Sequence, residues 1–319
     1  MYGSNYDFFK YSKLTSGASL LALLCSCIFF ALYGLNYGID FKGGSMLMVK
    51  DKNTSTVASY RAVLSDMKLG DFNITELFDP SKAVNENNEK VFLIRIEQVN
   101  EELSAQSDLI SRVRLEISKA FEDSSFLQAD SVGAKVSAEL VRSGVISILL
   151  AVFAVLIYVW LRFEWQFAVG AIAALIHDIM ITIGLFSFLR LEFNLAIIAA
   201  LLTIIGYSLN DTVVVYDRVR ENLKKNTKST LENLLNLSVN ETLSRTIRTS
   251  VTTLLALLAL YVFGGDVLRG FVSALIMGVI IGSYSSVFIA SKILMILGVK
   301  RDWSKVGSKA GTQFSNIDA

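Results

Sequence analysis

The sequence is poor in the residues that usually build metal sites and disulfides. It has two cysteines, one histidine and one proline in 319 residues. Cys25 and Cys27 lie two positions apart in an apolar segment, where a helix points them in different directions. This spacing argues against a disulfide or a metal clip. Because the single proline, Pro80, lies outside the apolar segments, glycine and serine must supply any flexibility there.

The sequence also lacks an excess of either charge. It contains 30 Lys and Arg against 29 Asp and Glu, which argues against nucleic acid as a partner. Hydrophobic residues make up 53% of the chain, and the mean hydropathy is +0.50. A water-soluble domain of this size rarely reaches such a value, because its charged surface lowers the average. The composition therefore predicts a protein with several membrane spans.

Six apolar segments have about the length of ~20 residues that a membrane-spanning helix requires. They are 17–37, 144–161, 167–189, 195–216, 251–264 and 271–289, the fifth being extended by 246–249. The first exceeds the roughly 7–15 apolar residues of a signal peptide, so we expect it to be retained. The predicted fold is an all-α six-helix membrane bundle, formed by 17–37 and 137–298.

The distribution of Lys and Arg predicts the orientation. These residues gather in the N-terminal segment 1–16, in the link 217–245 and in the tail 299–319. An even number of spans places all three on one side, which we expect to be the cytoplasm, with the chain in the cell inner membrane. Residues 38–136, between the first two spans, then form an extracytoplasmic domain in the periplasm.

The inserted segment alternates between strand and helix patterns in the order β-α-β-β-α-β. The expected strands are 45–49, 71–78, 91–99 and 126–132, the helices are 54–67 and 103–121, and a turn covers 80–89. This order is typical of a ferredoxin-like α+β domain. The segment has no histidine and no glycine-rich phosphate loop, so we interpret it as a binding or lever module.

Asp211 is the first candidate for a functional residue inside the membrane. A helix that begins near Asn194 places it about 25 Å along its axis, past the membrane midplane. A carboxylate at that depth is costly and marks a functional site by default. The alternative is a helix-end carboxylate that reaches water, a role that fits Asp217 better. Polar or nearby residues share its face: Thr203, Tyr207, Asn210 and Val214.

Two other polar groups are candidates. Arg245, at the start of the fifth span, can pair with Asp211, and a carboxylate that gains and loses a cationic partner can carry protons. Nearby Arg248 fits a positive-inside anchor better. His177 and Asp178, near the middle of the third span, fit either a proton relay or a polar pair that joins neighbouring helices.

The sixth span carries a small residue at every fourth position. Such a stripe allows the backbone of a neighbouring helix to approach closely, and it predicts packing without indicating an activity. Its members are Ala274, Gly278, Gly282, Ser286 and Ala290.

Several motifs in this order resemble the SecD/SecF family of bacterial protein-export proteins, within the RND transporter superfamily. They include Gly-Ile-Asp-Phe-Lys-Gly-Gly at 38–44, Ser-Val-Gly at 131–133, Phe-Glu-Trp at 163–165 and Ala-Leu-Ile-His-Asp at 174–178. The longest runs from 206 to 222, and 242–246 and 264–265 complete the set. The matched motif residues include Asp40, Phe41, Gly43, Gly44 and Gly206.

The resemblance implies a proton-coupled, non-enzymatic export subunit that needs no cofactor. It acts with SecD and the SecYEG channel, and with YajC, on a translocating preprotein, using the proton motive force after the ATP-driven SecA step. RND architectures use two six-helix halves, so SecD is the expected second half, surrounded by membrane lipids. The implied proton-coupling residues are Asp211, Arg245, Asn210, His177 and Asp178.

Other functions remain as alternatives. The first is half of an RND-type exporter of small molecules or lipids, against which the single half and the small outer domain argue. The second is a purely structural translocon subunit. An intramembrane hydrolase is disfavoured, because the lone histidine lacks a Gly-x-Ser-x-Gly nucleophile turn. A carboxylate can carry either a proton or a sodium ion, so the coupling ion also stays open.

Overall fold

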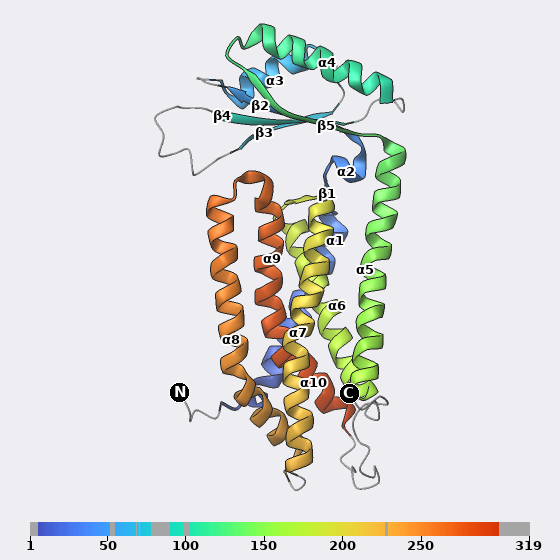
Figure 1. The fold of residues 1–319 in the computed structure, drawn as a ribbon, viewed down its shortest axis with the longest axis vertical. Coiled ribbons are helices and arrows are strands. Elements are labelled where there is room, and N and C mark those ends of the chain that lie inside the picture. The colour runs from blue at the N-terminus through green and yellow to red at the C-terminus, as the bar shows by residue number, and fades with distance from the viewer. Residues whose placement is uncertain are drawn as a thin grey trace, which may run out of the picture.

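The computed structural model of the protein describes residues 6–51, 55–67, 69, 71–77, 90–97, 103–226 and 229–299. A bundle of long helices forms one end of the molecule, and a small domain with a sheet forms the other (Figure 1). Six helical segments among the described residues are long and apolar enough to span a membrane, as predicted. They are Phe9–Tyr33, Lys135–Arg162, Trp165–Phe188, Leu195–Lys225, Leu231–Phe263 and Val267–Leu297.

The bundle consists of long helices whose termini differ in places from the expected spans. Its helices are α1 (Ser12–Tyr33), α5 (Ala134–Arg162), α6 (Trp165–Phe188), α7 (Leu195–Lys225), α8 (Leu231–Phe263) and α9 (Asp266–Ser285), followed by a π turn (Ser286–Ala290) and α10 (Ser291–Leu297). The first helix ends at Tyr33, before the expected limit of 37, because Gly34 takes a left-handed φ of 60°.

The link 217–245, expected as a cytoplasmic loop, is helical over most of its length. Helix α7 continues to Lys225 and α8 already begins at Leu231. The amide of Asn222 donates to the Ser238 hydroxyl at 3.0 Å. Apolar side chains between the two extensions are buried, which makes the helical form stable outside the spans. They are Val219, Leu223, Leu234, Leu235 and Val239.

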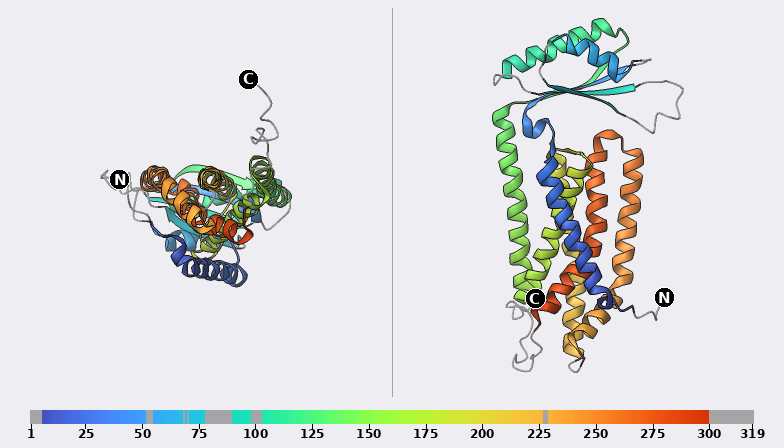
Figure 2. Two further views of the ribbon diagram at one scale, coloured as in Figure 1. Left: turned by 90° about the horizontal axis from the view of Figure 1, so that it is seen from below. Right: turned by 180° about the vertical axis from the view of Figure 1, so that it is seen from behind.

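The start of α1, the α7–α8 connection and α10 lie at the end of the bundle away from the sheet (Figures 1 and 2). This arrangement follows from an even number of spans. The connection between α6 and α7 and the connection between α8 and α9 lie at the opposite end, below the inserted domain (Figure 1).

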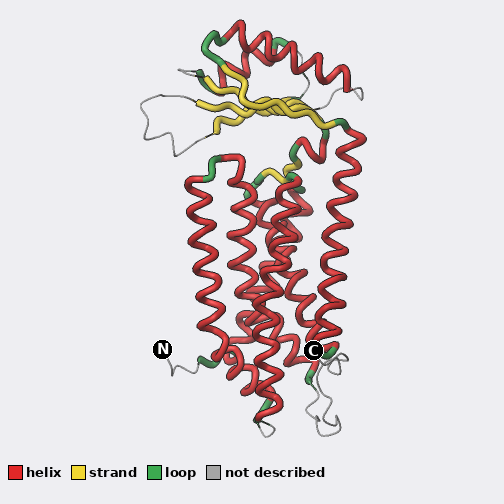
Figure 3. The backbone as a smooth tube through the Cα atoms, in the orientation of Figure 1, coloured by secondary structure: helices red, strands yellow, loops and turns green. Residues whose placement is uncertain are grey.

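The inserted domain has the predicted β-α-β-β-α-β order. Its elements are β2 (Gly44–Asp51), α3 (Val57–Ser65), β3 (Phe72–Leu77), β4 (Lys90–Glu97), α4 (Leu103–Ala120) and β5 (Ser125–Val132). The strands form an antiparallel sheet in the order β3-β4-β2-β5, and both helices cover its outer face (Figure 3). The expected turn at 80–89 lies outside the described residues.

The core of this domain lies between the sheet and its two helices. Leu47, Val49 and Ile94 of the sheet are fully buried, and Tyr60 of α3 stacks on Phe121 with ring centroids 4.2 Å apart. Each such side chain contributes about 1.5–3 kcal/mol of hydrophobic stabilisation. The domain therefore has its own core, separate from the buried clusters of the bundle.

Helix α9 packs closely against α7 along the predicted stripe of small residues. Any Cβ on Gly278 would collide with the Ile204 side chain, and one on Gly282 would lie 3.1 Å from the Cβ of Ser208. Further along, Ser286 contacts Asp211 by a hydrogen bond. The stripe is thus confirmed as a packing surface, and it brings α9 against the helix that carries Asp211.

Candidate functional site

Asp211 is buried between three helical segments, with 7% of its surface exposed. The hydroxyl of Thr246 on α8 donates to its Oδ1 at 2.6 Å, and the hydroxyl of Ser286 donates to its Oδ2 at 2.6 Å. One neutral hydroxyl therefore holds each oxygen of the carboxylate, in place of a cation. Such a site can accept a proton while both hydroxyls stay nearby.

Arg245 does not pair with Asp211 in this conformation. Its side chain is exposed, and no ion pair joins the two within the part of the chain that the structure describes. Neighbouring residues on an α-helix point about 100° apart, so the turn that aims Thr246 at α7 directs Arg245 elsewhere. The sequence placed the cation near the carboxylate, but the rotation of α8 separates them.

Asn210 and Gly206 lie on the open face of α7. Both are exposed, as is Thr203 one turn before Gly206, and a Cβ added to Gly206 would meet no atom within 4 Å. Asn210 therefore does not line the buried site of Asp211, although the two residues are neighbours in the same motif. The polar stripe predicted for α7 is divided between a buried part and an exposed part.

His177 and Asp178 form a second buried polar group on α6, 3% and 0% exposed. His177 Nδ1 lies 3.0 Å from Asp178 Oδ1. The other carboxylate oxygen of Asp178 accepts from Ser208 of α7 at 2.6 Å and from Ser285 of α9 at 2.8 Å. Every oxygen of this carboxylate thus has a partner, and its donors come from α6, α7 and α9.

Sequence reasoning missed the donors of both carboxylates. Ser208, Ser285 and Thr246 were not singled out as site residues, and Ser286 was noted only for packing. One signal was available: Ser285 and Ser286 are hydroxyl residues inside an apolar span, on the helix whose small residues predict close contact. Which carboxylate each one meets depends on the rotation of the helices.

The family-motif residues lie where the inserted domain meets the bundle. The short strand β1 (Asn36–Tyr37) pairs in parallel with β6 (Glu192–Phe193), which directly precedes α7. In α2 (Ile39–Lys42), the Asp40 carboxylate accepts from the backbone amide of Leu195 at 2.9 Å. Leu195 begins α7, so Asp40 caps the helix that carries Asp211 and also interacts favourably with its dipole.

The remaining motif residues shape this junction. The Phe41 ring lies against that of Phe193, with centroids 5.8 Å apart. Gly43 has a φ of 77°, and Gly44 has a φ of 140° where any Cβ would collide with the Ile96 carbonyl. Both positions require glycine, because side chains rarely adopt these angles. The pair therefore turns the chain sharply from α2 into the central strand of the sheet.

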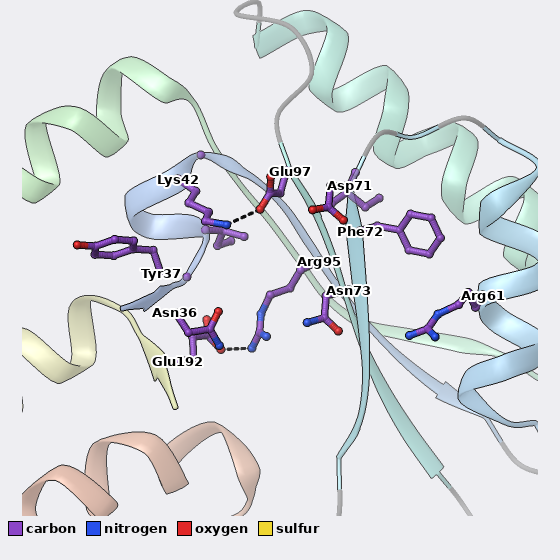
Figure 4. Close-up of a pocket in the computed structure, with 14 residues that line it drawn as sticks. Asn36, Tyr37, Lys42, Arg61, Asp71, Phe72, Asn73, Arg95, Glu97 and Glu192 are labelled. Atoms are coloured by element: carbon purple, nitrogen blue, oxygen red, sulfur yellow. Dashed lines mark hydrogen bonds and ion pairs between the residues drawn. The ribbon is translucent and has the colours of Figure 1, made fainter. Parts of the chain in front are cut away.

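A polar cleft of about 370 Å³ separates the sheet from this junction. Across it, Arg95 of β4 forms an ion pair with Glu192 of β6, and Lys42 Nζ lies 2.6 Å from Glu97 Oε1 (Figure 4). Burial raises the pKa of Glu192, and the Arg95 charge opposes that change. Glu192 thus links the sheet of the inserted domain to the start of α7.

Comparison with known proteins places this architecture in a family. The model for the C-terminal region of protein export membrane protein SecD/SecF matches residues 113–300, and the SecD/SecF GG motif matches residues 28–49. The chain belongs to the SecD/SecF family. The matched GG motif contains the Gly43–Gly44 turn and Asp40, and the C-terminal match contains both buried carboxylates.

Individual relatives cover almost the whole chain. Protein translocase subunit SecF of Cereibacter sphaeroides is 48% identical over 316 residues, which are 99% of this chain and 97% of that protein. The SecF subunit of Rhodobacter capsulatus is 44% identical over 308 residues, 95% of this chain and 92% of the relative. SecD/SecF family members of this type thus share the length of this chain.

Solved structures of SecDF match the fold. The crystal structure of SecDF from Thermus thermophilus, described as a translocon-associated membrane protein, has a TM-score of 0.79 and 33% identity. A second SecDF structure, in a super-membrane-facing form, has a TM-score of 0.67 and 35% identity. The chain covers 38% and 39% of those two SecDF chains, respectively, so each contains much that this chain lacks.

Proposed function

We propose that this chain is a SecF-type translocase subunit that, with SecD, uses the proton motive force to complete preprotein export through SecYEG after the SecA step. The observation that carries the proposal is the buried Asp211, whose carboxylate is held by two hydroxyls. Asp211 lies on α7, and the first residue of α7 is bonded to Asp40 at the base of the inserted domain. A proton carrier and a lever thus share one rigid element.

The proton step is proposed to occur at Asp211. A proton that enters from the periplasm binds the carboxylate, which then donates a hydrogen bond where it accepted one. The hydroxyls of Thr246 and Ser286 must reorient, and the attraction between α7 and its neighbours α8 and α9 changes. Release of the proton to the cytoplasm returns the carboxylate to its charged, accepting state.

Arg245 is proposed to contact Asp211 in a second arrangement of the helices. Thr246 now occupies the position beside the carboxylate, and Arg245 is the preceding residue on α8. A rotation of α8 by about 100° exchanges one for the other. Ionised Asp211 attracts the guanidinium and favours this second arrangement, whereas protonated Asp211 does not. The carboxylate's charge thereby selects between two packings.

The inserted domain is proposed to be a ferredoxin-like periplasmic lever. Motion of α7 reaches it through three connections: the β1–β6 pair, the Asp40 cap and the Arg95–Glu192 ion pair. These contacts all join residues 192–195 to the base of the domain. Transport becomes directional only if the domain binds the emerging preprotein with different affinity in the two arrangements.

The chain is proposed to pair with SecD through the exposed polar face of α7. The exposed amide of Asn210 is costly toward lipid and needs a protein or water partner, and Thr203, whose hydroxyl donates to the Ala199 carbonyl, lies on the same face. In contrast, α5 and α8 expose large apolar side chains suited to membrane lipids, such as Leu149, Phe153 and Leu255. We further propose that the chain lies in the cell inner membrane with both termini in the cytoplasm. YajC is proposed as an additional partner.

Reconstitution tests the proposal. Vesicles with this chain, SecD and SecYEG are loaded with SecA-initiated preprotein, and completion of export is followed with and without an imposed proton gradient. The gradient accelerates export by the wild type, and Asp211→Asn loses that acceleration while still assembling with SecD. Asp217→Asn is the matched control, because Asp217 is half-buried near the end of α7 and pairs with Arg162.

An unchanged response of Asp211→Asn places the proton path elsewhere and rejects the site. A sodium gradient that replaces the proton gradient would show that the carboxylate carries sodium. The alternative of a small-molecule exporter predicts gradient-driven efflux without SecYEG, and the relatives reported above, named SecF or SecDF, give it no support.

A further inference from the structure

Four consecutive residues of α9 and the π turn carry hydroxyl groups, and each reaches a different helix. Ser283 Oγ lies 2.6 Å from Ser250 Oγ of α8, and Tyr284 Oη lies 2.8 Å from Ser19 Oγ of α1. Ser285 donates to Asp178 of α6 at 2.8 Å, and Ser286 donates to Asp211 of α7 at 2.6 Å. We call residues 283–286 the hydroxyl turn.

The geometry of the helix explains this reach. With 3.6 residues per turn, four consecutive side chains point all around the helix axis. Polar groups are expensive inside a membrane unless they have partners, and every member of the hydroxyl turn has one. A helix packed among others can offer each of these groups a partner on a different helix, and α9 packs against α6, α7 and α8.

Each member of the turn also faces a backbone carbonyl as a second acceptor. Ser285 Oγ lies 3.2 Å from the carbonyl of Gly282, and Ser286 Oγ lies 3.1 Å from the carbonyl of Ser283. A hydroxyl has one proton to donate, so it can serve the carboxylate or the helix carbonyl, but not both fully. The choice depends on whether the carboxylate accepts or donates.

The backbone directly after the turn is also irregular. Residues Ser286–Ala290 form a π turn, and the Ser291 hydroxyl donates to the Ser286 carbonyl at 3.2 Å. π turns are rare and frequently occur at functional sites. The irregular backbone therefore begins at Ser286, the residue that donates to Asp211.

We infer that Ser285 and Ser286 couple the two buried carboxylates, so that the protonation of Asp211 changes the hydrogen bonding of Asp178. This inference rests on the proposed function, which makes Asp211 the proton carrier. When Asp211 binds a proton, its Oδ2–H donates to Ser286 Oγ, and the Ser286 hydroxyl proton turns to the Ser283 carbonyl. The shift at Ser286 moves the adjacent Ser285 relative to Asp178.

Among the described residues, few titratable groups face the hydroxyl turn, and only their protonation can act on it directly. Ser285 and Ser286 are fully buried, so bulk water does not compete for their protons. On α8, the nearby cation Arg245 is exposed and Thr246 contacts Asp211 instead. The titratable groups that face the turn are Asp178 and His177 of α6, Asp211 and Tyr207 of α7, and Tyr284 of the turn itself.

Infrared difference spectroscopy of the full chain in vesicles tests the coupling directly. The carbonyl band of protonated Asp211 and the carboxylate stretching band of Asp178 are assigned by their disappearance in Asp211→Asn and Asp178→Asn. Ser285→Ala removes a donor of Asp178 only, yet the inference predicts that it also shifts the Asp211 band. Ser286→Ala shifts the Asp178 band in turn. Ser147→Ala is the control, because its exposed hydroxyl donates only to Ser143 of its own helix.

The same variants are then measured in the export assay with SecD and SecYEG. Ser285→Ala and Ser286→Ala are expected to lower the gradient-stimulated rate about tenfold, the size of one lost hydrogen bond to a charged group. Ser286→Thr keeps the hydroxyl and is expected to restore the Asp178 band to its wild-type position.

The inference and the proposed function fail in different ways. If each serine variant shifts only the band of its own carboxylate, the two sites are independent and the coupling is wrong, whatever the export assay shows. If the bands are coupled but Asp211→Asn still responds to the gradient, the proposed function is wrong. Loss of both bands in Ser285→Ala indicates a disturbed bundle. Ser285→Cys then replaces it, because a thiol of similar size is a weaker donor; a shift of the Asp211 band supports the coupling, and no shift opposes it.

Discussion

Asp40 accepts a hydrogen bond from the backbone amide of Leu195, at 2.9 Å, although 155 positions separate them in sequence. This contact joins the motif before the inserted domain to the first residue of α7. The N-terminus of a helix carries unsatisfied amides and a partial positive charge, both of which a carboxylate satisfies. Helix α7 also carries Asp211, in its second half, so one helix links the inserted domain to the buried carboxylate.

Asp40→Ala should loosen this link. Loss of the cap costs about 0.5–2 kcal/mol of stability, and the inserted domain should follow α7 less closely. We expect a lower thermal unfolding midpoint and a weaker response of export to the proton gradient. Asp66→Ala is the control, because Asp66 is exposed at the end of α3. Equal effects of the two variants would argue against a special role for Asp40.

Arg245→Gln should separate stability from coupling. The exposed Arg245 has no ion pair with Asp211 in this conformation, so its replacement should change stability by no more than about 0.5 kcal/mol. If Arg245 contacts Asp211 in a second arrangement, gradient-driven export should nevertheless fall strongly. Thermal unfolding measures the stability, and the vesicle assay measures the gradient-driven export. Normal export by Arg245→Gln would remove this residue from the mechanism.

Gly278→Ala should destabilise the bundle. The added Cβ would collide with the Ile204 side chain, and overpacking of this kind costs about 1–3 kcal/mol. Gly17→Ala is the matched control, since a Cβ there meets nothing within 4 Å and alanine favours a helix by up to about 1 kcal/mol. Unfolding in detergent should therefore shift in opposite directions. A stabilising Gly278→Ala would contradict the close packing of α7 and α9.

Glu192 should make stability depend on pH. Burial raises its pKa in the folded protein, so the folded state binds more protons than the unfolded state at pH values above the ordinary glutamate pKa of about 4.3. The contribution of Glu192 to stability therefore falls as the pH rises through this window. In Glu192→Gln this fall disappears, and unfolding midpoints measured against pH should show a flatter profile.

Arg95→Gln provides the companion experiment. Arg95 lowers the pKa of Glu192, so its removal should raise that pKa further and extend the fall in stability to higher pH. A profile for Arg95→Gln that lies on the wild-type profile would show that the ion pair has little influence on the junction.

Local patterns determined much of this fold. The number of spans, the strand and helix order of the inserted domain and the small-residue stripe on α9 all follow from side-chain periodicity, which needs no knowledge of neighbouring elements. Charge cost alone identified Asp211 and the His177–Asp178 pair, and both are buried. The link 217–245 was wrongly expected as a loop, because its helices are stabilised by contacts across the two extensions.

Only the tertiary structure decided which groups meet. The sequence suggested that Arg245 pairs with Asp211, but the rotation of α8 presents Thr246 instead. It gave no partner for Asp40, which finds one at the start of a distant helix. A sequence places a side chain on a face of its own helix, whereas its hydrogen-bond partner depends on how neighbouring helices are rotated and shifted, and these are set by packing along their whole length.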